Sequence, residues 1–278
     1  MENAQQIKEL VQQKYSRIAA QEKESNQSSC CGSGCCSTEV YNIMTDDYGN
    51  LKGYQQEADL GLGCGLPTQF AKIKKGDTVI DLGSGAGNDC FVARAEAGES
   101  GMVIGIDFTP EMINKAKQNA RKLGFDNVIF YRGDVEKIPL ETSMADVVIS
   151  NCVLNLVPDK NAVFQEIFRV LKPGGHFSIS DIVLVGTLPQ ALQADAEMYA
   201  GCISGAVQKE IYLELVKQNG FLNISIQKEK TIIVPDDILN KYLTGDEIEY
   251  FKKGSTGIFS ITLYAEKPGA CCGSDCCK

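Results

Sequence analysis

Eight of the 12 cysteines lie in two short and nearly identical phrases. CCGSGCC spans residues 30–36, and CCGSDCC spans residues 271–277. Their cysteines are Cys30, Cys31, Cys35, Cys36, Cys271, Cys272, Cys276 and Cys277. Adjacent thiols bridge each other only with strain, but together they can bind one soft ion. The polar, glycine-rich surroundings cannot bury a core, so we expect two mobile arms with metal-binding or redox chemistry. Zinc or copper binding unrelated to catalysis is the alternative for both phrases.

Three further cysteines occur singly and far apart in the sequence. Cys64 lies in the glycine-rich GLGCGLP, Cys152 lies in SNCVLNL directly after an apolar strand, and Cys202 lies in AGCISGA. Each by itself could be a small buried apolar residue. The glycines beside Cys64 and Cys202 favour close approach in a loop, so the three thiols could meet over one cofactor. Cys90 differs, because it shares an apolar helix face with its neighbours, and we assign it a structural role.

A second chemical group is the loop DLGSGAG, residues 81–87, which follows an apolar strand and opens a helix. Its glycines let the backbone approach a ligand at the carboxyl end of a strand. Asp107 ends the next strand, 20 residues after Gly87. A carboxylate at that place meets ribose hydroxyls in nucleotide-type sites. The loop alone is compatible with a plain strand–helix turn, but together with Asp107 it predicts a nucleoside cofactor.

The spacing of the loop also indicates which cofactor binds. It reads G-x-G-x-G, and no basic residue in it could meet a pyrophosphate. Asp134, in GDVEKIPL after the third strand, is placed to accept a hydrogen bond from an adenine amine. With the turn LKPGGHFSISD, these motifs resemble the class I S-adenosylmethionine-dependent methyltransferases over roughly residues 76–183. The resemblance implies S-adenosylmethionine held by Asp81, Gly83, Ser84, Gly85, Gly87, Asp107, Phe108, Asp134, Val135 and Asn151.

The segments around the three single cysteines resemble the arsenite methyltransferases, over about residues 40–268. This resemblance implies that Cys64, Cys152 and Cys202 bind trivalent arsenic as thiolates. It also implies an N-terminal redox cysteine, for which we choose Cys35 among Cys30, Cys31, Cys35 and Cys36. Zinc would accept three thiolates and a water, but it does not explain the cysteine pairs. The resemblance further implies an acidic residue before the third cysteine, where this sequence has Gly201, and an extra C-terminal domain in larger relatives, for which we expect no counterpart here.

The function implied is transfer of methyl groups from S-adenosylmethionine to arsenite and then to methylarsenite, for arsenic detoxification or biotransformation. A thiol reductant, glutathione or thioredoxin, would act as co-substrate and reopen the disulfide that each turnover closes. Two alternatives stay open. One is a methyltransferase for another small molecule, such as a quinone ring, which would not need the three cysteines together. The other is a thiol-rich metal-sequestering protein, which would not need the glycine loop and Asp107.

The single cysteines and the cofactor motifs can meet only in a fold that brings distant loops to one edge of a sheet. Short apolar strands alternate with helices from about residue 76 to 183, which predicts an α/β fold with a doubly wound, mostly parallel sheet. The resemblance adds seven strands in a Rossmann-like arrangement with an antiparallel last strand. We expect an N-terminal helix and Cys-rich arm at 1–39, a methyltransferase domain at 40–268 and a Cys-rich tail at 269–278. The segment at about 184–220 would cap the pocket and bind arsenic.

The composition and charge of the chain exclude some classes of binding partner. The chain has 278 residues, a formal net charge of −9 and a pI of about 4.8. An acidic surface repels phosphate backbones and anionic lipid, so we expect neither nucleic-acid nor membrane partners. The first 20 residues contain no apolar run of signal-peptide type, and no window approaches a transmembrane span. We therefore expect a cytoplasmic protein, whose thiols are kept reduced.

Overall fold

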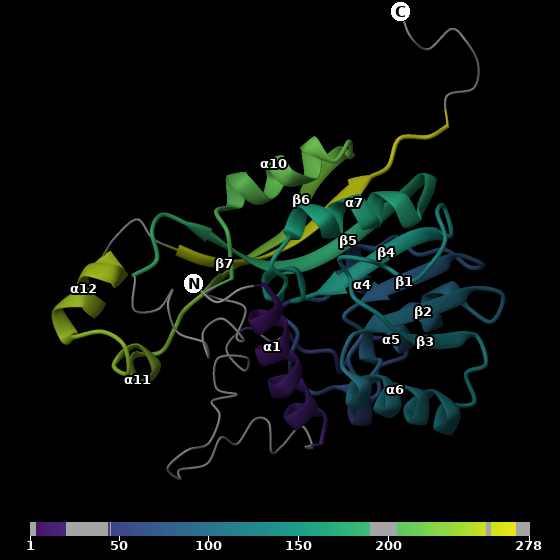
Figure 1. Ribbon diagram of the computed structural model, residues 1–278, viewed down its shortest axis with the longest axis horizontal. Coiled ribbons are helices and arrows are strands. Elements are labelled where there is room, and N and C mark those ends of the chain that lie inside the picture. The colour runs from purple at the N-terminus through teal and green to yellow at the C-terminus, as the bar shows by residue number, and fades with distance from the viewer. Residues whose placement is uncertain (1–3, 21–43, 45, 190–204, 254–256, 271–278) are drawn as a thin grey trace, which may run out of the picture.

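The computed structural model describes residues 4–20, 44, 46–189, 205–253 and 257–270, and its centre is one seven-stranded sheet (Figure 1). The strands lie in the order β3-β2-β1-β4-β5-β7-β6. Their bounds are β1 Thr78–Leu82, β2 Met102–Asp107, β3 Val128–Arg132, β4 Ala145–Asn151, β5 Leu171–Val185, β6 Leu222–Ile232 and β7 Gly257–Glu266. The α/β fold with a Rossmann-like sheet is confirmed.

The sheet is parallel from β3 to β5, and β7 runs antiparallel to both of its neighbours. This confirms the antiparallel last strand and places it between β5 and β6. Because parallel strands end at the same edge, the loops after β1, β2 and β4 lie together there. That edge is where the motifs of the sequence must meet.

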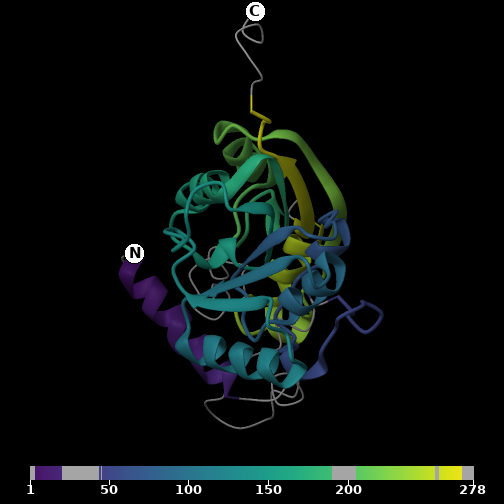
Figure 2. The same ribbon diagram turned by 90° about the vertical axis from the view of Figure 1, so that its right-hand side faces the viewer.

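Helices cover both faces of the sheet. The bounds are α1 Ala4–Ala19, α4 Pro67–Phe70, α5 Asn88–Ala97, α6 Pro110–Leu123, α7 Lys160–Val170, α10 Lys209–Gln218, α11 Asp236–Leu239 and α12 Gly245–Lys253, with short 3₁₀ turns at Gln56–Ala58 and Leu154–Leu156. One buried cluster joins α1, α5 and α6 to one face of the sheet, and a second joins α7 and α10 to the other. Figure 2 shows α1 packed beside α6, so the N-terminal helix extends the first layer.

Three local expectations need correction. The apolar run HFSISDIV predicts a strand from His176, but β5 begins at Leu171, because a register irregularity beside Ala145 and Val147 accommodates the K-P-G-G turn within the strand. The helix α12 was not predicted at all. The pair Thr109–Pro110 predicts a helix start with a hydroxyl cap, and α6 does begin at Pro110, but no side-chain hydrogen bond caps the helix. The backbone N–H of Thr109 donates instead to Asp107 Oδ1, at 2.8 Å.

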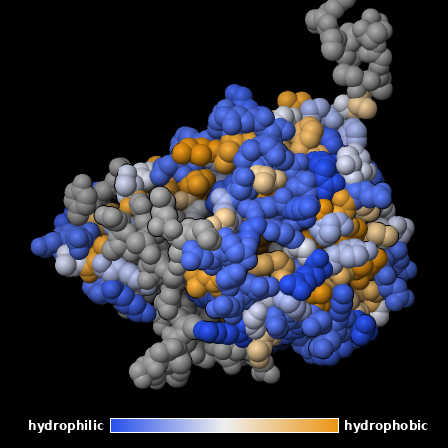
Figure 3. All heavy atoms as spheres, viewed as in Figure 1, coloured by the Kyte–Doolittle hydropathy of each residue, from blue (hydrophilic) through white to orange (hydrophobic). Residues whose placement is uncertain are grey.

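The surface is mixed in character. On the face shown in Figure 3, hydrophilic residues predominate and hydrophobic residues form small separate groups. Within the described ranges, no helix combines the length and the hydropathy that crossing a membrane requires. Cys202, CCGSGCC and CCGSDCC lie outside the described residues.

Candidate functional site

A pocket lies at the carboxyl ends of the parallel strands and gathers most of the predicted cofactor residues. The predicted residues that line it are Asp81, Gly83, Ser84, Gly85, Asp107, Phe108, Asp134, Val135, Asn151 and Cys152. Gly87 does not line it. It lies at the start of α5, where an added Cβ would come within 3.0 Å of the rings of Phe91 and Phe130. The structure thus brings together residues that span more than 70 positions of the sequence, and it leaves Gly87 as a packing residue.

Asp107 joins the glycine loop to the end of β2. Its Oδ2 accepts a hydrogen bond from the backbone N–H of Gly85 at 3.0 Å, and its Oδ1 accepts from Thr109. Burial raises the pKa of this carboxyl, while the two backbone donors oppose that shift. A carboxylate has about four acceptor positions, so lone pairs remain for hydroxyl groups in the pocket.

Helix α1 forms a wall of the pocket that sequence reasoning did not place. Lys8, Val11 and Tyr15 line the cavity. The Lys8 Nζ lies 2.6 Å from Asp134 Oδ2 and also pairs with Glu136. Burial lowers the pKa of Lys8, but its hydrogen bonds to these two carboxylates outweigh burial and raise it. The signal in the sequence was the apolar stripe of the helix, which required a partner surface but could not identify it.

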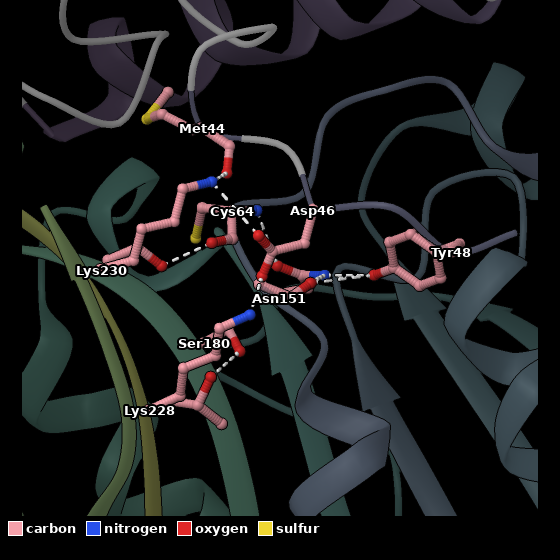
Figure 4. Close-up of polar contacts among 11 residues, drawn as sticks. Met44, Asp46, Tyr48, Cys64, Asn151, Ser180, Lys228 and Lys230 are labelled. Atoms are coloured by element: carbon pink, nitrogen blue, oxygen red, sulfur yellow. Dashed lines mark hydrogen bonds and ion pairs between the residues drawn. The ribbon is translucent and has the colours of Figure 1, made fainter. Parts of the chain in front are cut away.

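Asn151 fastens the Cys64 loop to the end of β4 (Figure 4). Its Oδ1 accepts from the backbone N–H of Cys64 at 3.0 Å, and its Nδ2 donates to the carbonyl of Gly65 at 2.8 Å. The same Nδ2 lies 2.5 Å from the hydroxyl of Tyr48, which donates to Asp89 Oδ2 at 2.9 Å. Asn151 therefore positions a cysteine loop as well as lining the pocket. Sequence reasoning missed Tyr48 and Asp89.

Glycines on both sides of Cys64 allow its loop to touch the sheet. A Cβ on Gly63 would lie 2.7 Å from the Asn151 amide nitrogen. A Cβ on Gly65 would lie 2.5 Å from Ser180 Oγ and 2.7 Å from Ser180 Cβ. Ser260 donates to the carbonyl of Cys64 from the other side. The close approach predicted from the flanking glycines is confirmed.

Substituting Gly65 with alanine should therefore displace the Cys64 loop. Overpacking of this kind costs about 1–3 kcal/mol of folding free energy, which chemical denaturation would measure. Gly245→Ala is the matched control, because a Cβ there meets nothing within 4 Å, and its effect should stay within about 0.5 kcal/mol. Equal stabilities of the two variants would contradict the close packing.

Two of the three predicted arsenic ligands lie beside each other. The ligand atoms of Cys64, Cys152 and Asp181 are all within 4.8 Å of one another, and all three residues are buried. Neither cysteine is in a disulfide. Cys152 has a φ of 60°, which is rare for a residue with a side chain, and its N–H donates to the carbonyl of Ser180 at 2.8 Å. The backbone thus fixes the direction of the Cα–Cβ bond of Cys152.

Asp181 was missed by sequence reasoning. It is completely buried in β5, where its Oδ1 accepts from the N–H of Ile182 at 3.0 Å and its Oδ2 accepts from the hydroxyl of Tyr212 at 3.2 Å. Burial raises its pKa to about 7, against the opposing charge of Lys160. The available signal was a single acid inside the otherwise uncharged strand FSISDIV.

Cys90 is buried, which confirms its assignment to the core. Its thiol donates to Asp81 Oδ2 at 3.1 Å. Burial raises the pKa of this thiol well above the usual range, and the nearby charge of Asp81 adds to the shift. The thiol therefore stays protonated and acts as a hydrogen-bond donor within the core.

The chain that follows the CCGSGCC phrase enters the described structure beside Cys64. Figure 4 shows Met44 and Asp46 next to the Cys64 loop. Asp46 pairs with Lys228 at 2.6 Å and with Lys230 at 3.2 Å, both on β6. These ion pairs hold the segment against the sheet.

Comparisons with known proteins agree with this geometry. Residues 73–220 match a family model described as a methyltransferase domain. The chain is 38% identical to the arsenite methyltransferase of Halobacterium salinarum, covering 88% of this chain and 66% of that protein. It is 31% identical to the arsenite methyltransferase of Aquipseudomonas alcaligenes, covering 84% and 68%.

A solved structure is similar as well. It is CrArsM, an arsenic (III) S-adenosylmethionine methyltransferase from Chlamydomonas reinhardtii, with a TM-score of 0.63 and 32% identity. The match covers 75% of this chain and 68% of that one. The chain thus spans about two thirds of the length of these relatives.

Proposed function

Because the chain belongs to the arsenite methyltransferase family, we propose that it transfers methyl groups from S-adenosylmethionine to arsenite and then to methylarsenite. The observation that carries the proposal is the pair of neighbouring buried thiols, of which Cys152 lines the same pocket as the glycine loop and Asp107, and Cys64 lies beside Cys152. A metal-sequestering protein does not need the glycine loop and Asp107, and a quinone methyltransferase does not need the pair of thiols.

The pocket fits S-adenosylmethionine, which supplies an electrophilic sulfonium methyl group when bound. The glycine loop offers close backbone approach, and the Asp107 carboxylate is the acceptor proposed for the ribose hydroxyls. Asp134 is the acceptor proposed for the adenine amine, although Lys8 pairs with it in this structure. Asp81, Gly83, Ser84, Gly85, Phe108, Val135 and Asn151 complete the proposed binding residues, whereas Gly87 supports the loop from outside the pocket.

Arsenic is the substrate proposed for the thiols of Cys64, Cys152 and Cys202. Each thiolate forms one As–S bond as one As–O bond breaks, and the thiol proton leaves with the hydroxyl as water. A pyramidal trithiolate keeps its arsenic lone pair, which is the nucleophile toward the methyl group. Two rigidly held thiols align that lone pair, and alignment is the largest contribution that the protein makes.

Reduction must follow each transfer, because methylation makes arsenic formally pentavalent. Two thiols supply the two electrons as they close a disulfide, and glutathione or thioredoxin reopens it. Cys35 is the proposed N-terminal redox cysteine. The ion pairs of Asp46 support this role, because they hold the chain after CCGSGCC beside Cys64. These steps suit the cytoplasm, where such reductants are present.

One experiment separates the three candidate functions. The protein is incubated with arsenite, thiol reductant and methyl-labelled S-adenosylmethionine, and the arsenic species are then separated and counted. Labelled methylarsenicals support the proposal. Arsenic that stays bound but unmethylated indicates sequestration, and label transfer only to a quinone indicates the other methyltransferase.

The two cysteine phrases should contribute differently. Deleting residues 270–278 should change turnover at saturating arsenite by less than about twofold, within the range of a neutral surface change. The same deletion should lower the number of arsenic atoms bound per chain. Replacing Cys30, Cys31, Cys35 and Cys36 with serine should slow multiple turnover but spare a single methyl transfer, as quenched-flow speciation would show. If deletion of the C-terminal phrase alone stopped turnover at saturating arsenite, this division of roles between the two phrases would be wrong.

A further inference from the structure

The cluster of Cys64, Cys152 and Asp181 contains a donor that arsenic does not require. Its three ligand atoms lie within 4.8 Å of one another. Trivalent arsenic on a thiolate site uses sulfur, whereas zinc binds thiolate and carboxylate together in tetrahedral sites. With Zn–S bonds of about 2.3 Å, two sulfurs on a tetrahedron lie roughly 3.8 Å apart, which is compatible with this cluster.

The surroundings hold these donors in place. The Tyr212 hydroxyl and the Ile182 N–H both donate to the Asp181 carboxylate, as outer partners of metal-bound carboxylates do. The backbone N–H groups of Cys64 and Cys152 are bonded to Asn151 and to the Ser180 carbonyl. The Asp181 carboxylate and the backbone of both cysteines are therefore ordered before an ion arrives, which reduces the entropy lost on binding.

The cluster also borders the pocket. Cys152 lines the pocket, whereas Cys64 and Asp181 lie behind it and are completely buried. Cys152 is thus the donor through which the cluster adjoins the pocket. By comparison, the buried pair of Cys90 and Asp81 offers one thiol and one carboxylate, which is too few protein donors for a stable zinc site.

The geometry points to a second ligand for this site: a zinc-class divalent ion bound by Cys64, Cys152 and Asp181, in competition with arsenic. Both ligands need the same two thiolates, so one excludes the other. The ion completes its tetrahedron with a water. The metal site stands on the geometry alone, whereas its inhibitory effect rests on the proposed function.

Cobalt(II) provides the direct test, because tetrahedral cobalt has visible absorption and thiolate ligands add near-ultraviolet charge-transfer bands. The full-length chain is used with the eight cysteines of the two phrases replaced by serine and with a phosphine reductant. We expect one cobalt per chain. Asp181→Asn and Cys152→Ser should each weaken binding more than about tenfold. Cys90→Ala, the matched buried thiol outside the cluster, should bind cobalt as the parent does.

Binding that is unchanged in Asp181→Asn, or that depends on Cys202 in place of Asp181, would overturn the donor set. Thermal unfolding without metal checks that the variants fold. If Asp181→Asn does not fold, X-ray absorption spectroscopy of the zinc-loaded parent identifies the donor atoms instead. Two sulfur neighbours with lighter donors support the site, and three or more sulfurs contradict it.

Zinc inhibition of arsenite methylation tests the competition. Raising the arsenite concentration should relieve the inhibition, and raising the S-adenosylmethionine concentration should not. For each protein, the zinc concentration that halves its own uninhibited rate is measured. This concentration should be more than about tenfold higher for Asp181→Asn than for the parent. Inhibition that arsenite cannot relieve would overturn the competition. Cobalt binding without any arsenite methylation would sink the proposed function and leave the metal site standing.

Discussion

Cys152→Ser should lower methylation of both arsenite and methylarsenite by at least about 100-fold. A serine hydroxyl is a much poorer ligand for trivalent arsenic than a thiolate, so the arsenic is no longer aligned with the methyl donor. The left-handed backbone of Cys152 and its hydrogen bond to Ser180 persist in the variant, because neither uses the sulfur. Radiolabel transfer from the cofactor to each substrate measures the effect.

Cys64→Ser should separate the two substrates. Methylarsenite has only two exchangeable positions, so two thiolates can hold it, whereas arsenite has three. The variant should therefore lose arsenite methylation and keep methylarsenite methylation, with Cys152 and Cys202 as the remaining ligands. Equal loss on both substrates would contradict this division.

Controls distinguish lost ligation from lost structure. Cys152→Ser should bind S-adenosylmethionine with the parent's dissociation constant, measured by calorimetry. Cys90→Ser removes a buried thiol outside the cluster and should retain most of the arsenite methylation. If Cys90→Ser lost as much activity as Cys152→Ser, the assignment of Cys152 as an arsenic ligand would be contradicted.

Asp107→Ala should weaken S-adenosylmethionine binding by about 10- to 100-fold. A hydrogen bond to a charged group contributes about 1.5–3 kcal/mol, and the proposed ribose contacts use this carboxylate. The variant also removes the acceptor for the N–H of Gly85, so the glycine loop loses its tie to β2. Isothermal titration calorimetry with the cofactor measures the change.

Glu99→Ala provides the matched acidic control. The Glu99 side chain is 92% exposed, beyond the end of α5, so its removal should leave cofactor affinity unchanged. Asp107→Asn should bind more weakly than the parent, because the amide keeps one acceptor atom and loses the charge. A parent-like dissociation constant in Asp107→Ala would remove Asp107 from the cofactor site.

Local patterns predicted much of this protein. The apolar runs MVIGID and ADVVISN predict strands at 102–107 and 145–151, and β2 and β4 have these bounds. The placement of Asp107 and the glycine loop follows from the same logic, since parallel strands end at one edge of the sheet. The nearness of Cys64 to Cys152 followed from family resemblance, and the structure agrees with it.

Only the tertiary structure decided which side chains meet across distant segments. Asp181 reaches the two cysteines because β5 lies beside β4, and Asn151 holds the Cys64 loop through bonds that no local pattern encodes. The position of α1 over the pocket depends on a surface formed by α6 and on the ion pair of Lys8 with Asp134. Periodicity determines the face that an element buries, but the neighbour on that face is selected by packing of the whole chain.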